Sequence, residues 1–312
     1  MDCSHSELQT RGLGISGIVG AVSVAFLWAL CYPLITTTVG AAPPLVIAAL
    51  RALFAGLTLL VPSFWFGRSQ PRGWDWLVVA AIGVTWTGVG FAGMFSAGGR
   101  ISPGVATVVA NSQPLLAAVL GSFALDERLV PNQTIGIGIA FAGVGVVALP
   151  SLIRGSGSTA TSIGGLVYVL LGALGVAVGN VLMKRYASRL DVVSTTGWQL
   201  IIGSAVLFAA VGVGRQAVSI HWTRDAVLAF VALFSLGTAV PFALWLALLK
   251  RAPLHSLNAF TFLTPPIALG IGVLFYGESL GLLEVVGTVL VVGGAWVAAG
   301  RLRNGGKRPK GS

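Results

Sequence analysis

The fold is decided by residues 100–143, RISPGVATVVANSQPLLAAVLGSFALDERLVPNQTIGIGIAFAG, because this stretch returns 151 positions later. The second copy is residues 251–294, RAPLHSLNAFTFLTPPIALGIGVLFYGESLGLLEVVGTVLVVGG, and it aligns without a gap. The pairs that coincide are Arg100 and Arg251, Pro114 and Pro265, Ala117 and Ala268, Gly121 and Gly272, Glu127 and Glu278, Leu129 and Leu280, Gly136 and Gly287, and Gly143 and Gly294. Chance similarity between apolar segments would rarely align Arg, Pro, Glu and Gly in one register. Earlier in each half, a shift of 148 positions places Gly17 on Gly165 and Arg51 on Gln199. The chain therefore contains an internal duplication.

The composition is that of a membrane protein. Only 9% of the 312 residues are charged, 55% are hydrophobic, and the mean hydropathy is +0.91. A soluble domain carries about a quarter charged residues, so this composition excludes an ordinary cytosolic enzyme, a disordered protein and a nucleic-acid-binding protein. The net charge of +10 does not indicate a nucleic-acid partner, because Lys and Arg stand singly or in small groups between apolar runs. We expect the lipid bilayer to surround most of the chain.

Loop signals divide the chain into ten apolar runs, each near the roughly 20 residues that a helix needs to cross a bilayer. The runs are 15–39, 44–66, 76–97, 103–125, 133–152, 163–183, 194–213, 226–248, 255–276 and 282–300. The sequence thus predicts an all-α integral membrane protein with ten transmembrane helices. Each half has five spans, an odd number, so the second repeat (163–300) must insert inverted relative to the first (13–152). Inverted repeats are typical of transporters, whose halves rock around a central site.

The distribution of positive charge predicts the orientation. With the N-terminus in the cytoplasm, most of the 19 Lys and Arg residues fall on the cytoplasmic side, as the positive-inside rule requires. An even number of spans returns the C-terminus to the same side, where residues 301–312 form a basic tail. We therefore expect a multi-pass protein of the inner or plasma membrane with both termini cytoplasmic.

Paired motifs connect the duplication to a known family. The stretches 111–114 to 126–128 and 263–266 to 277–279 each place a proline in the fourth helix and a glutamate after it. Together with Trp28, Pro33 and Arg51, they resemble the EamA family of the drug/metabolite transporter superfamily over about residues 13–300. The resemblance implies a small-metabolite carrier but leaves the substrate open, because members carry amino acids, other metabolites and drugs. The second half departs from it, with Val176 and Val181 where the first half has Trp28 and Pro33.

Prolines inside the predicted spans indicate where a solute cavity lies. A proline frees the carbonyl one turn earlier, and a freed carbonyl is tolerated in the membrane only beside protein or a watery cavity. The substrate-binding candidates on or near such helices are Trp28, Tyr32, Phe91, Phe95, Asn111, Gln113, Asn180, Trp245, Asn258 and Phe262. The gating or structural candidates are Pro33, Arg51, Pro114, Glu127, Pro241, Pro265 and Glu278. For each aromatic residue the alternative is ordinary packing or lipid contact.

Three charged candidates carry explicit alternatives. Arg51 is the only charge well inside a predicted span, and it either binds a substrate anion, makes a structural bond, or snorkels toward the outer surface. Glu127 and Glu278 end the fourth helix of each half. They either gate the two sides of the membrane or cap the helix that follows.

The chain offers little else that could carry chemistry. All nine acidic residues lie in tails, loops or helix ends, so direct proton coupling through a carboxylate at membrane depth is not supported. Cys3 and Cys31 give no disulfide framework, and the three histidines are scattered. We therefore expect no metal and no cofactor.

The inverted repeat predicts an alternating-access transporter, and the family resemblance implies export of amino acids or related neutral or zwitterionic solutes. A multidrug efflux carrier is the alternative within the same class. A membrane-embedded enzyme would need convergent acid–base or nucleophilic residues at depth, and a channel would need a charged ring or filter, and neither pattern is visible. The oligomeric state, monomer or homodimer, stays open.

Overall fold

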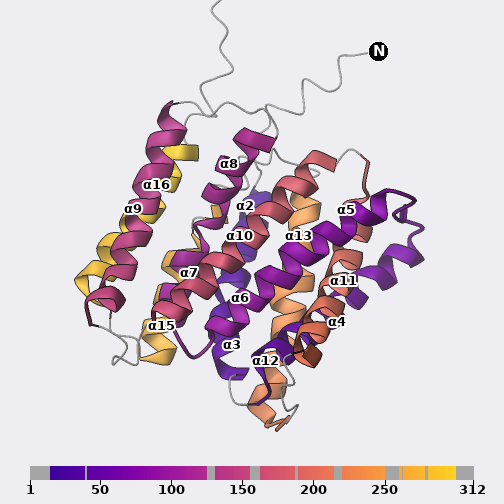
Figure 1. The fold of residues 1–312 in the computed structure, drawn as a ribbon, viewed down its shortest axis with the longest axis horizontal. Coiled ribbons are helices and arrows are strands. Elements are labelled where there is room, and N and C mark those ends of the chain that lie inside the picture. Colours follow the sequence, from indigo (N-terminus) through magenta and orange to yellow (C-terminus); the bar gives the residue numbers. More distant parts are fainter. Residues whose placement is uncertain are drawn as a thin grey trace, which may run out of the picture.

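A computed structural model describes residues 15–38, 41–124, 131–154, 162–186, 189–213, 220–249, 260–261, 263–277 and 280–299. These residues form helices joined by short loops, and they contain no β-strand (Figure 1). The first half comprises α2 (Ile15–Ala29), α3 (Cys31–Thr38), α4 (Pro44–Trp65), α5 (Asp75–Ile82), η1 (Gly83–Val89), α6 (Gly90–Ala97), α7 (Pro103–Ala110), α8 (Gln113–Ala124) and α9 (Pro131–Arg154). The second comprises α10 (Ile163–Tyr186), α11 (Val192–Val213), α12 (Arg224–Phe234), η3 (Ser235–Ala239), α13 (Val240–Leu249), α15 (Thr264–Tyr276) and α16 (Leu282–Ala299).

The helices coincide with the apolar runs of the sequence. Seven segments have the length and hydropathy of membrane spans: Ile15–Thr38, Pro44–Trp65, Asp75–Ala97, Pro103–Ala124, Ile163–Tyr186, Val192–Val213 and Arg224–Trp245. Shorter apolar helices, Thr134–Val147, Thr264–Tyr276 and Leu282–Val297, occupy the other three runs. The predicted all-helical, multi-pass membrane protein is confirmed, while the number of ten crossings stays a prediction.

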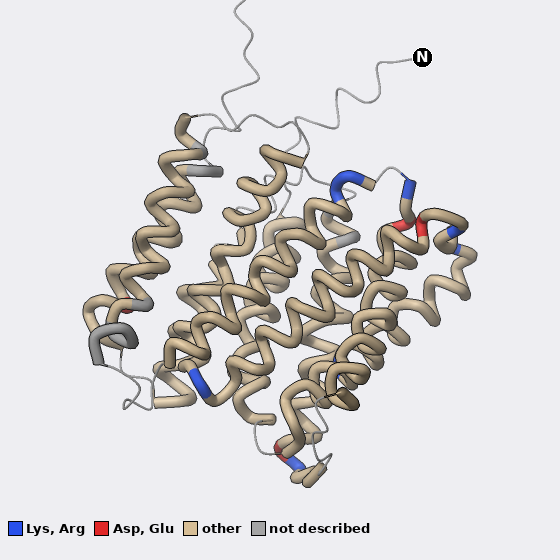
Figure 2. The backbone as a smooth tube through the Cα atoms, viewed as in Figure 1, with Lys and Arg blue, Asp and Glu red and all other residues tan. Residues whose placement is uncertain are grey.

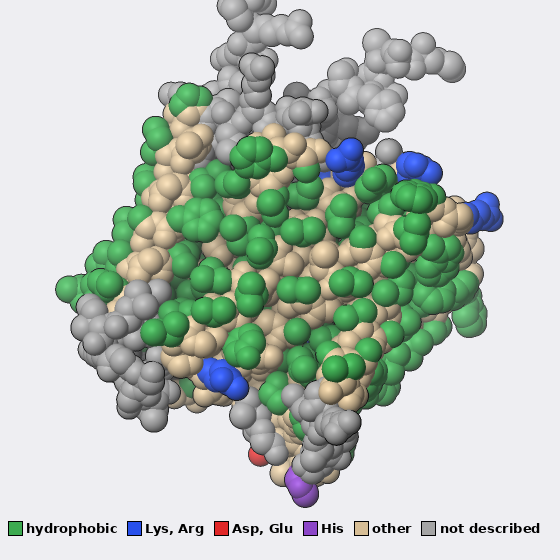
Figure 3. Space-filling view, in the orientation of Figure 1, with side chains coloured by type: hydrophobic (Ala, Val, Ile, Leu, Met, Phe, Trp, Pro, Cys, Tyr) green, Lys and Arg blue, Asp and Glu red, His purple; other side chains and the backbone are tan. Residues whose placement is uncertain are grey.

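The surface of the molecule has the apolar character of one that contacts lipid. Charged side chains gather near the ends of the helices, and the face between them is covered with hydrophobic side chains (Figures 2 and 3). Large apolar residues such as Phe64 and Trp296 are 56% and 70% exposed, an arrangement that a bilayer accepts and water does not. Asp75, Asp225 and Glu284 each lie in the first turn of a helix, where the helix dipole favours negative charge.

The main helix contacts join one half to the other. At one edge α9 packs against α16, and at the opposite edge α4 packs against α11 (Figure 1). Between them, α7 packs against α15, the η1–α6 segment against α10, and α2 and α3 against α13 and α12. The second, fourth and fifth helices of each half thus contact their own counterparts. The first and third helices contact the third and first of the other half.

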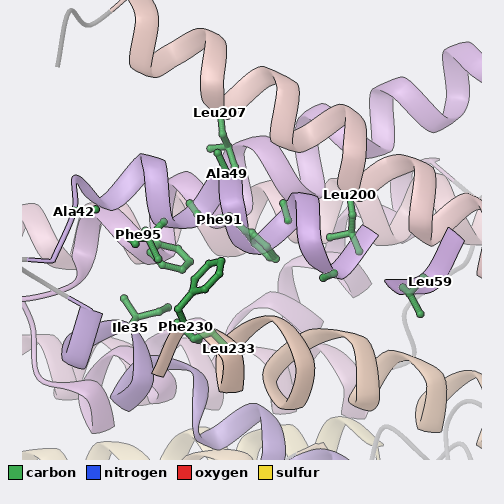
Figure 4. Packing of buried hydrophobic residues seen from close by; sticks show 14 residues of the cluster. Ile35, Ala42, Ala49, Leu59, Phe91, Phe95, Leu200, Leu207, Phe230 and Leu233 are labelled. Carbon is green, nitrogen blue, oxygen red and sulfur yellow. The ribbon is translucent and has the colours of Figure 1, made fainter. Parts of the chain in front are cut away.

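A buried hydrophobic cluster fills the space between α3, α4, α6, α11 and α12. Phe91, Phe95 and Phe230 turn toward one another beside Ile35 (Figure 4). Small residues of α4, such as Ala48 and Ala52, are fully buried in the same cluster and let the neighbouring helices come close.

Glycines set the approach of α9 and α16. A Cβ on Gly287 would lie 2.8 Å from both the carbonyl oxygen of Gly143 and the backbone nitrogen of Val147. A Cβ on Gly294 would meet the backbone of Ala140 at 2.5 Å. Membrane helices associate largely through such close backbone packing, because lipid provides no hydrophobic drive between them.

We expect Gly287→Ala to lower the apparent Tm of the purified protein in detergent, because the added methyl meets backbone that cannot rotate away. Overpacking of this kind costs about 1–3 kcal/mol. The matched control is Gly293→Ala on the same helix, where no atom lies within 4 Å of the added Cβ. An equal Tm for the two variants in a thermal unfolding scan would contradict this account of the interface.

Candidate functional site

The predicted prolines break the helices near the middle of the molecule. Pro33 and Pro114 cannot donate a backbone hydrogen bond to the residue four positions earlier. Accordingly α2 ends at Ala29 and α7 ends at Ala110, each four residues before its proline. Pro265 lies in the first turn of α15. Pro33 and Pro114 therefore coincide with helix breaks, while the role of all three prolines at a solute cavity stays a prediction.

Three unpartnered polar side chains lie at these breaks. Tyr32 belongs to one buried cluster with Val109 of α7 and Leu269 of α15, so the three broken spans meet there. The hydroxyl groups of Tyr32, Ser112 and Thr264 are buried and have no hydrogen-bond partner. A buried polar group without a partner is costly, so each of these hydroxyl groups is a candidate contact for a polar solute. We call Tyr32, Ser112 and Thr264 the junction site.

The predicted polar turn in the fourth helix lies at the junction site. Asn111 and Gln113 are half-buried and flank the fully buried Ser112. The side-chain amide of Asn111 donates a 2.8 Å hydrogen bond to the carbonyl oxygen of Thr107, and therefore binds the end of its own helix. The most buried polar group of this turn is Ser112, and a substrate role of the turn stays a prediction.

The predicted aromatic residues divide into two groups. Trp28 and Trp245 lie together, with ring centroids 5.5 Å apart, and Phe242 contacts Trp28 at 6.5 Å. Trp86 joins this group through Phe242, at 6.1 Å. Trp86 is not among the residues predicted from the sequence, because nothing in the apolar run 76–97 indicates whether its side chain faces the protein or the lipid.

The second aromatic group surrounds Arg51. Arg51 is 3% exposed, and its guanidinium carbon lies 4.6 Å from the ring centroid of Phe91 and 5.7 Å from that of Phe95. Its Nε donates to Thr238 Oγ1 at 2.9 Å. Arg51 therefore does not snorkel to the surface.

Pro241 explains why Arg51 reaches η3. A proline at 241 leaves the carbonyl oxygen of Gly237 without its usual helical donor. Arg51 Nη2 donates to this oxygen at 3.3 Å, and the Cys31 thiol lies 3.5 Å from it. Arg51 Nη2 also lies 3.4 Å from Cys31 Sγ.

An equivalent bond lies in the other half. Thr87 Oγ1 in η1 donates to Gln199 Oε1 of α11 at 2.7 Å, and both residues are buried. The shift of 148 positions relates Arg51 to Gln199, and the shift of 151 relates Thr87 to Thr238. Each second helix therefore holds the π-helical segment of the other half's third helix through a threonine.

Two groups of contacts lie toward opposite ends of the spans. Tyr276, at the end of α15, donates to the carbonyl oxygen of Pro33 at 2.7 Å and lies 2.9 Å from Thr37 Oγ1. At the other end, Arg68 pairs with Asp191 and Arg189 pairs with Asp75, each at 3.4 Å. These pairs are partly exposed, so each contributes little by itself.

The remaining predicted residues are placed in part. Asn180 is half-buried on α10, beside Gly179, whose backbone faces Trp86. Asn258, Phe262, Glu127 and Glu278 lie outside the residues that the structure describes. Within the described residues, no group of His, Cys, Asp or Glu is arranged to hold a metal ion.

Comparison with known proteins gives consistent matches along the chain. "Protein PecM" of Dickeya dadantii is 28% identical over 85% of this chain and 86% of its own length. An "Uncharacterized transporter" of Synechocystis is 29% identical over 86% of this chain and 84% of its own length. The "Probable amino-acid metabolite efflux pump" of Salmonella typhimurium is 26% identical over 89% of this chain and 92% of its own length.

A solved crystal structure supports the fold. It matches 92% of this chain and 98% of its own, with a TM-score of 0.65 and 24% sequence identity. The model of the EamA-like transporter family matches twice, at residues 15–149 and 163–300. The chain therefore belongs to the EamA-like transporter family.

Proposed function

We propose that this protein is an alternating-access carrier built from two inverted five-helix halves, residues 13–152 and 163–300, with ten crossings. The observation that carries the proposal is the pair of related bonds, Arg51 to Thr238 and Gln199 to Thr87. Two equivalent contacts between halves are what a pseudo-two-fold axis in the membrane plane generates. Such an axis gives two related conformations, one open to each side.

The proposed cargo is an amino acid or a related neutral or zwitterionic metabolite, carried outward. Relatives named as probable amino-acid metabolite efflux pumps support the class and the direction. The junction site supports it too, because hydroxyl groups of Tyr32, Ser112 and Thr264 suit a small polar solute. The described carboxylates lie at helix starts, which disfavours a polycationic cargo.

Transport by proteoliposomes tests the function. Vesicles preloaded with a mixture of amino acids should release particular members when the wild-type protein is present, as measured by mass spectrometry. A parallel set preloaded with cationic dyes and drugs distinguishes the multidrug alternative. Release of the dyes alone would overturn the amino-acid proposal while leaving a carrier in place.

Side-chain removal at the fourth helix tests the site. We expect Ser112→Ala and Gln113→Ala to raise the apparent KM several-fold, because a lost hydrogen bond costs about 1 kcal/mol. The control is Ser122→Ala on the same helix, whose hydroxyl donates locally to the carbonyl oxygen of Val119 at 2.7 Å. Unchanged KM values in both test variants would mean that the solute binds elsewhere, and the Trp28 group would become the next candidate.

The topology proposal places both termini in the cytoplasm of the inner or plasma membrane. Reporter domains fused after residue 72 and after residue 154 should report the cytoplasmic and the outer side, respectively. The reason is the concentration of Lys and Arg in the loops on the first side. The same side for both fusions would exclude the ten-span arrangement.

Transport should not strictly require a pH gradient, because the described carboxylates lie at helix ends rather than at membrane depth. Counterflow of labelled solute into preloaded vesicles with equal pH on both sides should proceed, with and without a protonophore. Complete loss of exchange under these conditions would point instead to a titrating group such as Glu127 or Glu278.

A further inference from the structure

We infer that the charge of Arg51 recognises a carboxylate group of the transported solute, an assignment that rests on the proposed carrier function. Three observations lead to it: an unused donor on Arg51, the position of the described carboxylates, and the neutral counterpart of Arg51 in the other half.

The guanidinium of Arg51 is only partly used by the protein. Nε is bound to Thr238, and Nη2 to the carbonyl oxygen of Gly237 and the sulfur of Cys31. Nη1 is buried and has no hydrogen-bond partner. The protein therefore fixes the guanidinium from one side and leaves a donor nitrogen unused.

The charge itself has no counter-ion among the described residues. The described carboxylates are Asp75, Asp191, Asp225 and Glu284, which lie at or just before helix starts. The two ion pairs that they form involve Arg68 and Arg189. A buried cation without an anion is unfavourable, so an anionic partner that arrives with the solute would bind it strongly.

The architecture does not require this charge. Gln199, the counterpart of Arg51 in the repeat, holds Thr87 with a neutral amide, and both residues are fully buried. The hydroxyl of Thr238 donates to the carbonyl oxygen of Leu233 at 3.2 Å, so it accepts from position 51. The two N–H groups of a glutamine amide at position 51 could donate to Thr238 and to the carbonyl oxygen of Gly237. The positive charge is therefore additional to the structural bond that the two halves share.

The surroundings suit a carboxylate. Phe91 and Phe95 flank the guanidinium and exclude water, which strengthens any ionic hydrogen bond that it makes. The chain continues from Cys31 directly to Tyr32, whose buried hydroxyl also has no partner. A single arginine matches a group of one negative charge, as in an amino acid, rather than a phosphate dianion.

The test compares each solute with its carboxamide. Binding of amino acids and of the corresponding amino-acid amides to purified wild-type protein in nanodiscs would be measured by calorimetry, in chloride-free buffer. We expect the wild type to prefer the carboxylate form by about ten- to a hundred-fold, because a hydrogen bond to a charged group is worth that much. Arg51→Gln should abolish the preference and leave the weak binding of the amide unchanged.

Two controls separate recognition from folding. Thr87→Val removes the related bond in the other half without changing charge, so it should keep the carboxylate preference. Arg51→Lys should keep part of it. Size-exclusion profiles and Tm values show whether Arg51→Gln is folded. If it is not, the wild-type preference and the Arg51→Lys variant still decide the question.

The outcomes are distinct. Equal wild-type affinity for acid and amide would overturn the assignment, as would a folded Arg51→Gln variant that keeps the preference. Binding of the acid that chloride weakens in the wild type and in Thr87→Val, but not in a folded Arg51→Gln variant, would support an anion site at Arg51. Transport of solutes without any carboxylate preference would leave the carrier function intact and remove only this inference. A wild type that neither binds nor transports any solute of the panel would remove both.

Discussion

In a bilayer every backbone polar group needs a partner inside the protein, and this constraint explains the centre of the molecule. A π-helical segment and a proline disturb the hydrogen-bond ladder of the eighth span, and leave the carbonyl oxygen of Gly237 free. Arg51 and Cys31, from two other helices, lie against that oxygen. Arg51 of α4 and Cys31 of α3 thus both contact one backbone oxygen of η3, and this shared contact fixes the three helices together. The other π segment is held through a side chain instead, because Thr87 donates to Gln199 Oε1.

The edges of the molecule differ from this centre. Gly56 and Gly197 bring α4 and α11 to backbone contact, as Gly143 and Gly287 do for α9 and α16. At these glycine pairs no side chain separates the two helix backbones. The breaks before Pro33 and Pro114, by contrast, leave short helical segments with few internal hydrogen bonds. In the alternating-access mechanism proposed above, we expect the broken spans to yield more easily than the glycine-packed edges.

The sequence was sufficient for the positions of the helices and of two helix breaks, for identifiable reasons. Apolar length and flanking charge locate helices, and proline at 33 and 114 locates breaks, because both effects are local. The convergence of Arg51, Phe91, Phe95 and Pro241 could be suspected only from their residue types. The bond from Arg51 to Thr238 joins residues 187 positions apart, which no local pattern indicates. Trp86 lies in a π-helical segment, and its local sequence does not indicate that segment. Whether α9 or α16 crosses the whole bilayer likewise depends on the helices packed against it as well as on its own sequence.

Several differences between the two halves involve Arg51, Pro241 or the first span. α10 is continuous where the first span is broken, in line with Val181 replacing Pro33. Gly90 stands where the second half has Pro241, and Gln199 stands where the first has Arg51. In the proposed mechanism two related halves alternate between two states, but an asymmetric solute requires an asymmetric site. Among these differences, Arg51 adjoins the broken first span through Cys31, so this region is a candidate for the recognition of an asymmetric solute.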